Sequence, residues 1–300
     1  MKKILTLLAL TIACSINAQV QYQNTSTTGS STSSAIGTYT VASAGGAFAS
    51  GRDTKATGNY STAMGYFSEA NGATSTAMGS RGKANGDFST VMGYDSDANG
   101  DNSLAMGQFS AANGKFSTAM GYSSKANDYS SLVIGYNNLS GSTVTGSATA
   151  ANSANTLFVI GNGTNNSIRS DAFKVMANGD TTVSNDLTVS GDVVVSSDAR
   201  LKANIMSLGS TLAKLLLIDG KRYTMKKNGK QKIGVLAQDI QKVFPELVTT
   251  DDKDMLAVNY QGLVPVLINA LKEQQSEIDT YRKEVSELKK RFNQLITKKE

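Results

Sequence analysis

A fourteen-residue repeat constrains this 300-residue chain more than any other feature of its sequence. From Ala56 to Leu139 six copies follow one another without a slip, among them ATGNYSTAMGYFSE, ANGATSTAMGSRGK and ANGDFSTVMGYDSD. The phase is kept by the glycines Gly65, Gly79, Gly93, Gly107, Gly121 and Gly135, and two looser upstream copies are marked by Gly37 and Gly51. Fourteen residues are too few for a helix–turn–helix unit but suffice for two short strands and two turns. The period therefore predicts a β-solenoid in which each copy forms one coil and pairs in parallel with the next.

The repeat also predicts its own turns and core. Asn-Gly pairs favour tight turns because both residues tolerate positive φ, and they occur at Asn71-Gly72, Asn85-Gly86, Asn99-Gly100 and Asn113-Gly114. The glycine that follows Ala-Met or Val-Met is expected to mark the second bend. Alanine, valine and methionine are the only apolar residues at fixed positions. We therefore expect a thin core built from them, which lateral association of chains would help to stabilise.

The stretch STAMGYFSEANG resembles the head repeat of trimeric autotransporter adhesins, and the resemblance extends over about residues 28–142. It implies left-handed parallel β-rolls packed as a homotrimer. The sequence shows no counterpart of the C-terminal membrane-anchor strands of those adhesins, so anchoring by that route is not expected. Besides its own copies, the expected partner of such a fibre is a surface molecule or a glycan, which the sequence does not identify.

Carboxylates in the repeats raise two alternative functions. Asp95, Asp97 and Asn99 have the spacing of a calcium loop, but Met106 stands where the bidentate glutamate belongs. We expect a solvated turn there, with no metal and no cofactor. Glycoside hydrolysis needs two carboxylates at a set separation. The carboxylates of this region are instead scattered, at Glu69, Asp87, Asp95, Asp97, Asp101 and Asp128, so we expect no activity on an external substrate.

The first 18 residues predict export. A basic start, MKK, precedes the apolar run ILTLLALTIA, and INA before Gln19 resembles a signal-peptidase site. The run is too short for a permanent membrane helix, and residues 19–27 are expected to form a flexible N-terminus. Lipid anchoring through Cys14 is the less favoured alternative, because Thr11 stands where a lipoprotein box has leucine. The expected location is extracellular or at the cell surface, associated with the outer membrane, after transit through the periplasm.

The chain has no histidine, and removal of residues 1–18 would also remove its only cysteine. Triads and dyads that use histidine, and sites where histidine or cysteine binds a metal, are thereby excluded. Residues 19–196 carry 8 basic and 11 acidic residues, whereas residues 197–300 carry 19 and 13. The basic residues are spread out without interleaved aromatics, so no nucleic-acid partner is expected. Nor does the mature chain contain a segment expected to span a membrane.

Beyond Leu139 the period breaks, and residues 143–196 predict a β-rich neck of short strands and turns. At its end, SSDARLK places Ser197 five residues before Lys202. A lysine amine whose pKa is lowered by desolvation can take the proton of a serine hydroxyl, so such a pair can supply nucleophile and base without histidine. Spacing alone favours a plainer interpretation, in which Ser197 and Asp198 cap a helix while Arg200 and Lys202 are solvated.

Three stretches, SSDARLKANI, KIGVLAQDIQKVFPELV and LAVNYQGLVPVLINALKEQ, resemble in order the intramolecular chaperone of endosialidase tailspikes. This is the peptidase S74 auto-processing domain, found also in myelin regulatory factor, and the resemblance covers about residues 196–275. It implies that the domain trimerises and folds a tail-fibre-like protein and then releases itself by autoproteolysis. Ser197 would be the nucleophile and Lys202 the base, with the Ser196–Ser197 bond cut and Asp198 and Arg200 in supporting roles. The alternative is an uncleaved fibre with this domain as a permanent clamp.

The sequence thus predicts a mainly β chain, with a solenoid fibre, a β neck and a small α+β domain at 197–262. Residues 263–300 predict a helix that continues as a coiled coil. Within the domain, SLGSTLAKLLLIDG has helical spacing, KRYTMKKNGKQKIGVLA predicts a hairpin over Asn228-Gly229, and AQDIQKVFPELV predicts a helix that ends at Pro245. From Leu267 to Leu295 apolar residues alternate steps of four and three. These heptads do not fix the number of strands, and a trimer is expected from the resemblance alone.

Overall fold

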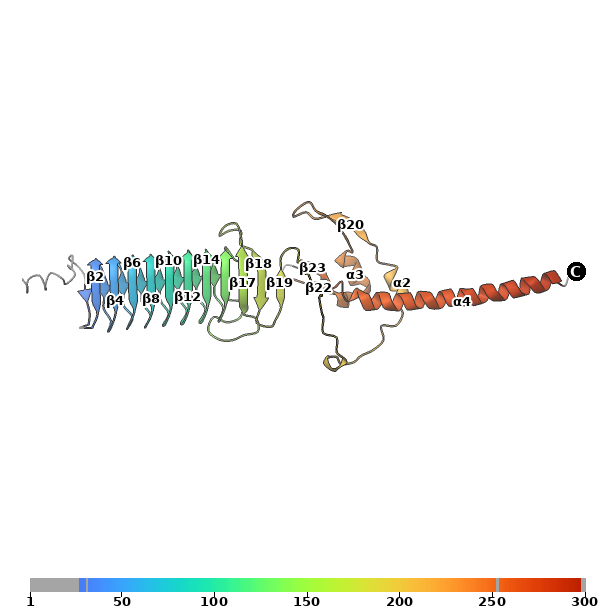
Figure 1. The fold of residues 1–300 in the computed structure, drawn as a ribbon, viewed down its shortest axis with the longest axis horizontal. Helices are drawn as coiled ribbons and strands as arrows, with labels where there is room; N and C mark the ends of the chain where they lie inside the picture. The colour runs from blue at the N-terminus through green and yellow to red at the C-terminus, as the bar shows by residue number, and fades with distance from the viewer. Residues whose placement is uncertain (1–26, 31, 252–253, 298–300) are drawn as a thin grey trace, which may run out of the picture. The chain divides into compact units, whose positions relative to one another are not determined.

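The computed structural model describes residues 27–30, 32–251 and 254–297. It divides into two compact units, Met1–Asp192 and Val193–Glu300 (Figure 1). The predicted signal peptide, Cys14 and nearly all of the predicted flexible N-terminus lie outside the described residues.

In the first unit the repeats form a β-solenoid, as predicted, with one long and one short strand in each coil (Figure 1). The long strands stack into one parallel sheet: β2 (Ser34–Thr38), β4 (Phe48–Arg52), β6 (Thr62–Tyr66), β8 (Thr76–Ser80), β10 (Thr90–Tyr94), β12 (Leu104–Gln108), β14 (Thr118–Tyr122) and β16 (Leu132–Tyr136). The short strands stack into a second: β1 (Thr27–Thr28), β3 (Val41–Ala42), β5 (Lys55–Ala56), β7 (Glu69–Ala70), β9 (Lys83–Ala84), β11 (Asp97–Ala98), β13 (Ala111–Ala112) and β15 (Lys125–Ala126).

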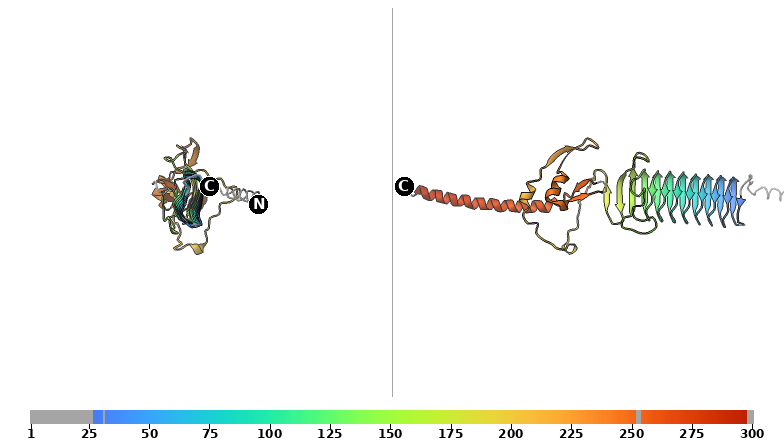
Figure 2. Two further views of the ribbon diagram at one scale, coloured as in Figure 1. Left: turned by 90° about the vertical axis from the view of Figure 1, so that its left-hand side faces the viewer. Right: turned by 180° about the vertical axis from the view of Figure 1, so that it is seen from behind.

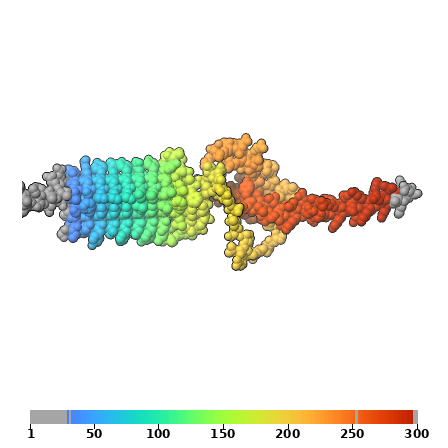
Figure 3. Space-filling view, in the orientation of Figure 1, coloured from blue at the N-terminus to red at the C-terminus, as the bar shows by residue number. Residues whose placement is uncertain are grey.

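Neighbouring coils pair in register over the whole stack. Residues one repeat apart lie opposite each other, as Met78 does with Met92 in the long sheet and Ala84 with Ala98 in the short sheet. The strands follow one another in the order of the sequence when the stack is seen from behind (Figure 2). In the space-filling view the coils form evenly spaced ridges (Figure 3).

The core between the two sheets consists of very small side chains. Each coil buries an alanine or valine from its long strand and an alanine from its short strand, such as Ala77 and Ala84, with no exposed surface. Met78, next to Ala77 on the strand, is only partly buried, because alternate residues of a strand point to opposite faces. The expectation that methionine contributes to the core is therefore wrong. The methionines lie in a row on the outer face of the long sheet.

The turns differ from the prediction in where positive φ falls. In the Asn-Gly pairs of the repeats neither residue has positive φ, which falls instead three residues after the asparagine, as at Thr74 and Phe88. The predicted second bend is confirmed, with positive φ at Gly79 and at Arg81. The glycine of the Asn-Gly pair is needed for close stacking, because a Cβ on Gly86 would lie 2.1 Å from the carbonyl oxygen of the next coil.

At the end of the repeat, other groups supply the hydrogen-bond acceptors that a further coil would have supplied. Inside the stack the backbone N–H of Lys83 donates to the carbonyl oxygen of Ser96 (2.9 Å), whereas the N–H of Lys125 donates to the side-chain oxygen of Asn138 (2.8 Å). Strand β17 (Thr156–Asn162) then adds one more parallel strand to the long sheet. Strands β18 (Asp171–Met176) and β19 (Thr181–Val183) follow in antiparallel pairing.

The predicted neck is only partly formed as strands. After Val183 the chain has no regular secondary structure up to η1 (Ala199–Leu201), and the apolar residues Leu187, Val189 and Val193 are exposed. Within the described residues no strand lies beside this segment to complete its hydrogen bonds. A strand needs such a neighbour, because its backbone groups are not satisfied internally.

The second unit is a small α+β module followed by a long helix. After η1 its elements are α2 (Leu212–Leu215), β20 (Lys221–Thr224), β21 (Gln231–Gly234), α3 (Ala237–Val243), η2 (Pro245–Leu247), β22 (Val248–Thr250), β23 (Leu256–Val258) and α4 (Leu263–Thr297). The hairpin over Asn228-Gly229, the helix before Pro245 and the last helix are confirmed. The helix predicted from SLGSTLAKLLLIDG is only one turn long.

The core of this module is small and is built around α3. Ile240, Phe244, Leu247 and Val266 are buried together, and partly buried apolar residues from α2, from the β22–β23 hairpin and from α4 are among those that pack against them. In the part of the chain that the structure describes, no helix combines the length and the apolar character needed to cross a membrane.

Candidate functional site

A single 3-10 turn, η1, shapes the seam that the sequence singled out. Asp198 caps it, since its carboxylate accepts a hydrogen bond from the backbone N–H of Arg200 at 2.8 Å. Aspartate is favoured at such a position because its side chain satisfies an N–H that the turn leaves without a partner. The N–H of Lys202 then donates to the carbonyl oxygen of Ala199 (3.1 Å), and the backbone is extended again at Lys202.

Across this turn the amine of Lys202 reaches the hydroxyl of Ser197. The distance from Nζ to Oγ is 2.7 Å, which is that of a hydrogen bond. Residues five apart do not face each other on an α-helix, and these two meet because a short turn lies between two extended residues. The structure thus brings the sequence-predicted pair together, within the reach that proton transfer requires. Its use as nucleophile and base stays a prediction.

Asp198 and Arg200 support the turn between Ser197 and Lys202. The guanidinium Nη2 lies 2.7 Å from Oδ2 of Asp198, and Nε lies 3.1 Å from both carboxylate oxygens. The Arg200 side chain lowers the pKa of Asp198, and the same hydrogen bonds raise the pKa of Arg200. The plainer interpretation therefore describes Asp198 in part, because this residue does cap a turn, although a 3-10 turn rather than a helix.

The site is open to solvent in the single chain. Ser197 and Lys202 are both exposed. The apolar residues around them are exposed as well, including Val194 at 89%, Leu201 and Met206. A set of large apolar side chains in one short segment is usually covered by other apolar surface. The pair therefore lies in a segment whose apolar surface the described residues of one chain leave uncovered.

Sequence reasoning missed Glu273, a residue of α4 that holds the chain downstream of the pair. Its carboxylate accepts hydrogen bonds from Ser210 Oγ (2.7 Å) and from the backbone N–H groups of Thr211 (2.6 Å) and Leu212 (3.2 Å). These bonds, led by that of Ser210, lower the pKa of Glu273. Ser210 and Thr211 before a helix are a capping signal. Nothing in the sequence indicates that the acceptor lies 62 residues away from Thr211.

A second surface of interest is the outer face of the long sheet in the first unit. Apolar side chains stand there in register, one from each of the six coils from β6 to β16: Met64, Met78, Met92, Met106, Met120 and Ile134. Threonine and leucine form a parallel row two residues upstream, and Leu132 and Met120 are both exposed. We call this surface the methionine face. An uncovered apolar surface of this kind packs against another subunit in many proteins.

Several carboxylates of the repeats make contacts between coils. Asp87 accepts a hydrogen bond from the backbone N–H of Ala73 (2.8 Å), and Glu69 forms an ion pair with Lys55 (3.0 Å). Burial raises the pKa of Asp97. In the turn with calcium-like spacing, the Asn99 oxygen accepts a hydrogen bond from Asn85. Among the residues described, no three His, Cys, Asp or Glu side chains are grouped as metal ligands.

Two parts of the chain match known protein families. Residues 197–249 match the chaperone of endosialidase, of the peptidase S74 type. Residues 56–81, 84–110 and 112–138 match the YadA head domain repeat, in a form that contains two copies. Both resemblances inferred from the sequence are thereby confirmed, and the chaperone match begins at Ser197 itself. A comparison with curated proteins gave no match to the chain.

Proposed function

From YadA-type head repeats followed by a chaperone-of-endosialidase domain, we propose an exported, homotrimeric, adhesin-like fibre that cuts itself between Ser196 and Ser197. The chaperone domain aligns three chains, so that the slow, non-local pairing of strands can begin in the correct register. Its release leaves a fibre that is kinetically trapped. One observation carries the self-cleavage, namely the 2.7 Å contact of Lys202 Nζ with Ser197 Oγ at the first residue of the chaperone match.

The proposed chemistry follows from the place of the nucleophile beside the bond that it cuts. The neutral amine of Lys202 takes the proton of Ser197 Oγ, and this oxygen attacks the carbonyl carbon of Ser196 through a five-membered ring. As the C–N bond breaks, the Ser197 nitrogen takes that proton from the Lys202 ammonium and becomes a free amine. The acyl group of Ser196 is then an ester on Ser197 Oγ. Water hydrolyses this ester to a carboxylate and the free hydroxyl.

Two uncovered apolar surfaces support assembly with copies of the same chain. One is the methionine face of the solenoid. The other is the heptad seam of α4, where the residues are exposed along the helix: Ile278, Tyr281, Val285, Leu288, Phe292 and Leu295. With Ile278 and Val285 at a positions, Glu284 lies at g and Lys289 at e of the next heptad. Opposite charges then face each other between parallel chains in register.

Assembly also explains how an exposed lysine could act as a base. A base must be neutral, and desolvation favours the neutral form of an amine. Val194, Leu201 and Met206, which are close to the pair in the sequence, are exposed apolar residues that neighbouring subunits can cover. Water would be excluded from Lys202 by the same contacts. We therefore expect cleavage to follow trimerisation, not to precede it.

Intact mass and denaturing electrophoresis of the purified protein test this proposal. The wild type should yield a fragment that ends at Ser196 and a fragment of residues 197–300. Ser197→Ala and Lys202→Ala should remain full length and trimeric in sedimentation. Lys202→Arg should also remain uncut, because a guanidinium keeps its proton. Ser196→Ala retains both the nucleophile and the base, so it should still be cut.

The other outcomes are equally informative. A wild-type trimer that stays intact would contradict self-cleavage and leave the permanent clamp as the function of the C-terminal domain. Cleavage of Ser197→Ala or of Lys202→Ala would contradict the roles given to these residues. A wild-type protein that sediments as a monomer would contradict the homotrimer.

A further inference from the structure

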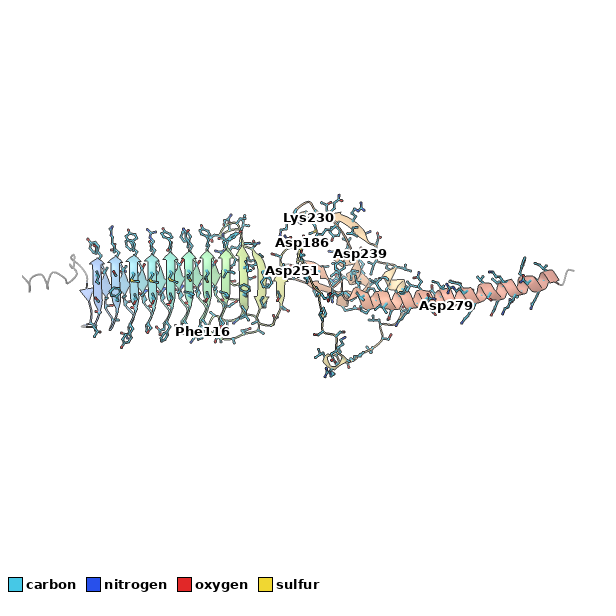
Figure 4. The ribbon with its side chains drawn as sticks, in the orientation of Figure 1. Phe116, Asp186, Lys230, Asp239, Asp251 and Asp279 are labelled. Carbon is cyan, nitrogen blue, oxygen red and sulfur yellow. The ribbon has the colours of Figure 1, made fainter. Side chains whose placement is uncertain are left out.

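The turn from each short strand to the next long strand carries two rows of side chains. The first, the amide ladder, consists of Asn71, Asn85, Asn99, Asn113 and Asn127, in which each Nδ2 donates to the Oδ1 of the next residue. The distance is 2.8 Å from Asn71 to Asn85 and 2.6 Å from Asn85 to Asn99. The second, the ring row, consists of Tyr60, Phe88 and Phe116, each at the positive-φ position of this turn. Figure 4 shows Phe116 at the edge of the solenoid.

The amide ladder uses only part of its hydrogen-bonding capacity. A side-chain amide has two N–H donors and an oxygen that accepts two bonds, and the ladder takes one of each. From Asn71 to Asn113 these side chains are exposed. Each coil therefore presents a donor and an acceptor to solvent, repeated about every 4.8 Å along the stack. The result is a line of equivalent polar groups, which suits a linear polymer better than a single small molecule.

The ring row has twice this period. Tyr60, Phe88 and Phe116 lie two repeats apart, which corresponds to about 9.6 Å along the stack. They are 73%, 59% and 46% exposed. The intervening coils have Thr74 and Asn102 at the same place, with the same positive φ. Because threonine and asparagine adopt the same conformation at this position of the turn, the fold does not require an aromatic residue at it.

We propose that this edge of the solenoid binds an extended β-1,4-linked glycan that lies along the stack. In such a polymer the disaccharide repeat is close to the two-coil spacing, and every second pyranose ring presents the same face. That face is made of C–H groups and would stack on the aromatic rings of the ring row, while sugar hydroxyls bond to the amide ladder. A neutral glycan fits best, because the ladder is uncharged and the nearby Asp101 and Lys115 pair with each other at 3.9 Å.

Tyr60 and Phe88 are more exposed than the tyrosines at the opposite turn. Tyr66, Tyr94 and Tyr122 also lie two repeats apart, but Tyr94 and Tyr122 pack edge-to-face on Phe109, with ring centroids 5.7 Å and 5.8 Å away. Tyr66 packs in the same way on Phe67. In the ring row only Phe116 has such neighbours, the Tyr129 ring and the Lys115 amine, both 5.6 Å from its ring. The three tyrosines therefore provide a matched control.

This proposal gives the adhesin-like fibre a class of ligand and rests on that function, although not on self-cleavage. The test is binding of wild type and of the uncut Ser197→Ala protein to microcrystalline cellulose, chitin and α-linked dextran beads. Both proteins should bind cellulose or chitin and should not bind dextran. Replacement of Tyr60, Phe88 and Phe116 by threonine should lower the affinity by about tenfold or more. The same replacement of Tyr66, Tyr94 and Tyr122 should leave it unchanged.

The sharpest variant combines Phe88→Thr with Asn102→Phe, which moves one ring by one coil and keeps the number of rings. Its affinity should fall as far as that of Phe88→Thr alone, since Tyr60 and Phe116 keep their spacing, and binding as tight as that of the wild type would overturn the argument from spacing. Absence of binding by wild type and Ser197→Ala alike, or equal binding to dextran, would overturn the ligand class. Loss of the trimer in the ring variants would assign the row to a subunit contact instead. An uncut wild type that binds cellulose would contradict self-cleavage alone.

Discussion

At the scale of single residues, the solenoid depends on glycines, because the coils are too close together for a side chain at these positions. Gly79 and Gly86 both approach the next coil so closely that a Cβ would lie within 2.2 Å of a carbonyl oxygen. Gly79 also has positive φ, whereas Gly86 does not. The two glycine rows of the repeat therefore share one requirement, the close approach of backbones, and only one of them also needs the left-handed conformation.

The glycine of the Asn-Gly pair offers a direct test of this requirement. We expect Gly86→Ala to lower the free energy of unfolding by about 3 kcal/mol or more, because the added methyl group meets backbone on a rigid neighbouring coil. Gly45→Ala is the matched control, since its Cβ would have only side-chain atoms nearby, at 3.8 Å and 3.9 Å. Chemical denaturation of both variants measures the difference. Equal stability of the two would contradict the stacking argument.

The sequence predicted the place of these residues better than their role. The Asn-Gly pairs do mark a turn. Their glycine is needed because the adjacent coil lies so close, and a local sequence pattern does not predict the distance between coils. For the same reason Asn138 could not be predicted to replace a backbone carbonyl at the end of the stack. Ser197 and Lys202 were predicted as a pair, whereas the turn that brings them together depends on the cap formed by Asp198.

At the scale of elements, Glu273 joins two helices that are far apart in the sequence. Its pKa in the folded protein is lowered from the ordinary value of 4.5. A carboxylate of this kind contributes stability above its unfolded pKa and loses that contribution as the pH falls through its lower folded pKa. The start of α2 should thus remain attached to α4 at neutral pH and loosen on acidification below about 4.5.

Hydrogen exchange at the amides of Thr211 and Leu212 measures this attachment. In the wild type their protection should fall between neutral pH and pH values below about 4. Glu273→Gln should show low protection already at neutral pH, with little further change on acidification. Glu277→Gln, on the same helix, should behave as the wild type does. Undiminished protection in Glu273→Gln at neutral pH would show that this carboxylate does not hold α2.

The long helix provides a second prediction at this scale. Val285→Asp combined with Leu288→Asp places charges in the heptad seam, so we expect loss of the trimer and, with it, loss of cleavage. Lys283→Asp combined with Ser286→Asp adds the same two side chains outside the seam and should leave both intact. Sedimentation and electrophoresis report the two properties separately. Cleavage by a monomeric seam variant would contradict the dependence of the reaction on assembly.

Elements with strong local signals were predicted well. The Asn228-Gly229 hairpin, the helix before Pro245 and the heptads of α4 are all encoded by neighbouring residues. The helix expected from SLGSTLAKLLLIDG is reduced to Leu212–Leu215, and its start is fixed by Glu273 from outside the segment. The predicted neck strands after Val183 do not form for a related reason, since this extended segment has no partner strand among the residues that the structure describes.

At the scale of the whole molecule, each unit leaves apolar surface that one chain cannot cover. The first unit has the methionine face, and the second has the seam of α4 and the apolar residues beside Ser197. These separate surfaces all need apolar surface to cover them, and association of several copies of the same chain is the simplest way to provide it. Their coincidence links folding, assembly and the proposed cut, because the contacts that would join the chains would also remove water from Lys202.

The closure of the stack by Asn138 has a further consequence for how such a protein can change. The last coil is completed by residues outside the repeat, so coils upstream can be gained or lost without disturbing that end. A gain or loss of one coil would shift every later aromatic ring on the edge out of alternation, whereas a change of two coils would restore it. Fibres of different reach that keep a common binding period are therefore expected to differ by multiples of two repeats.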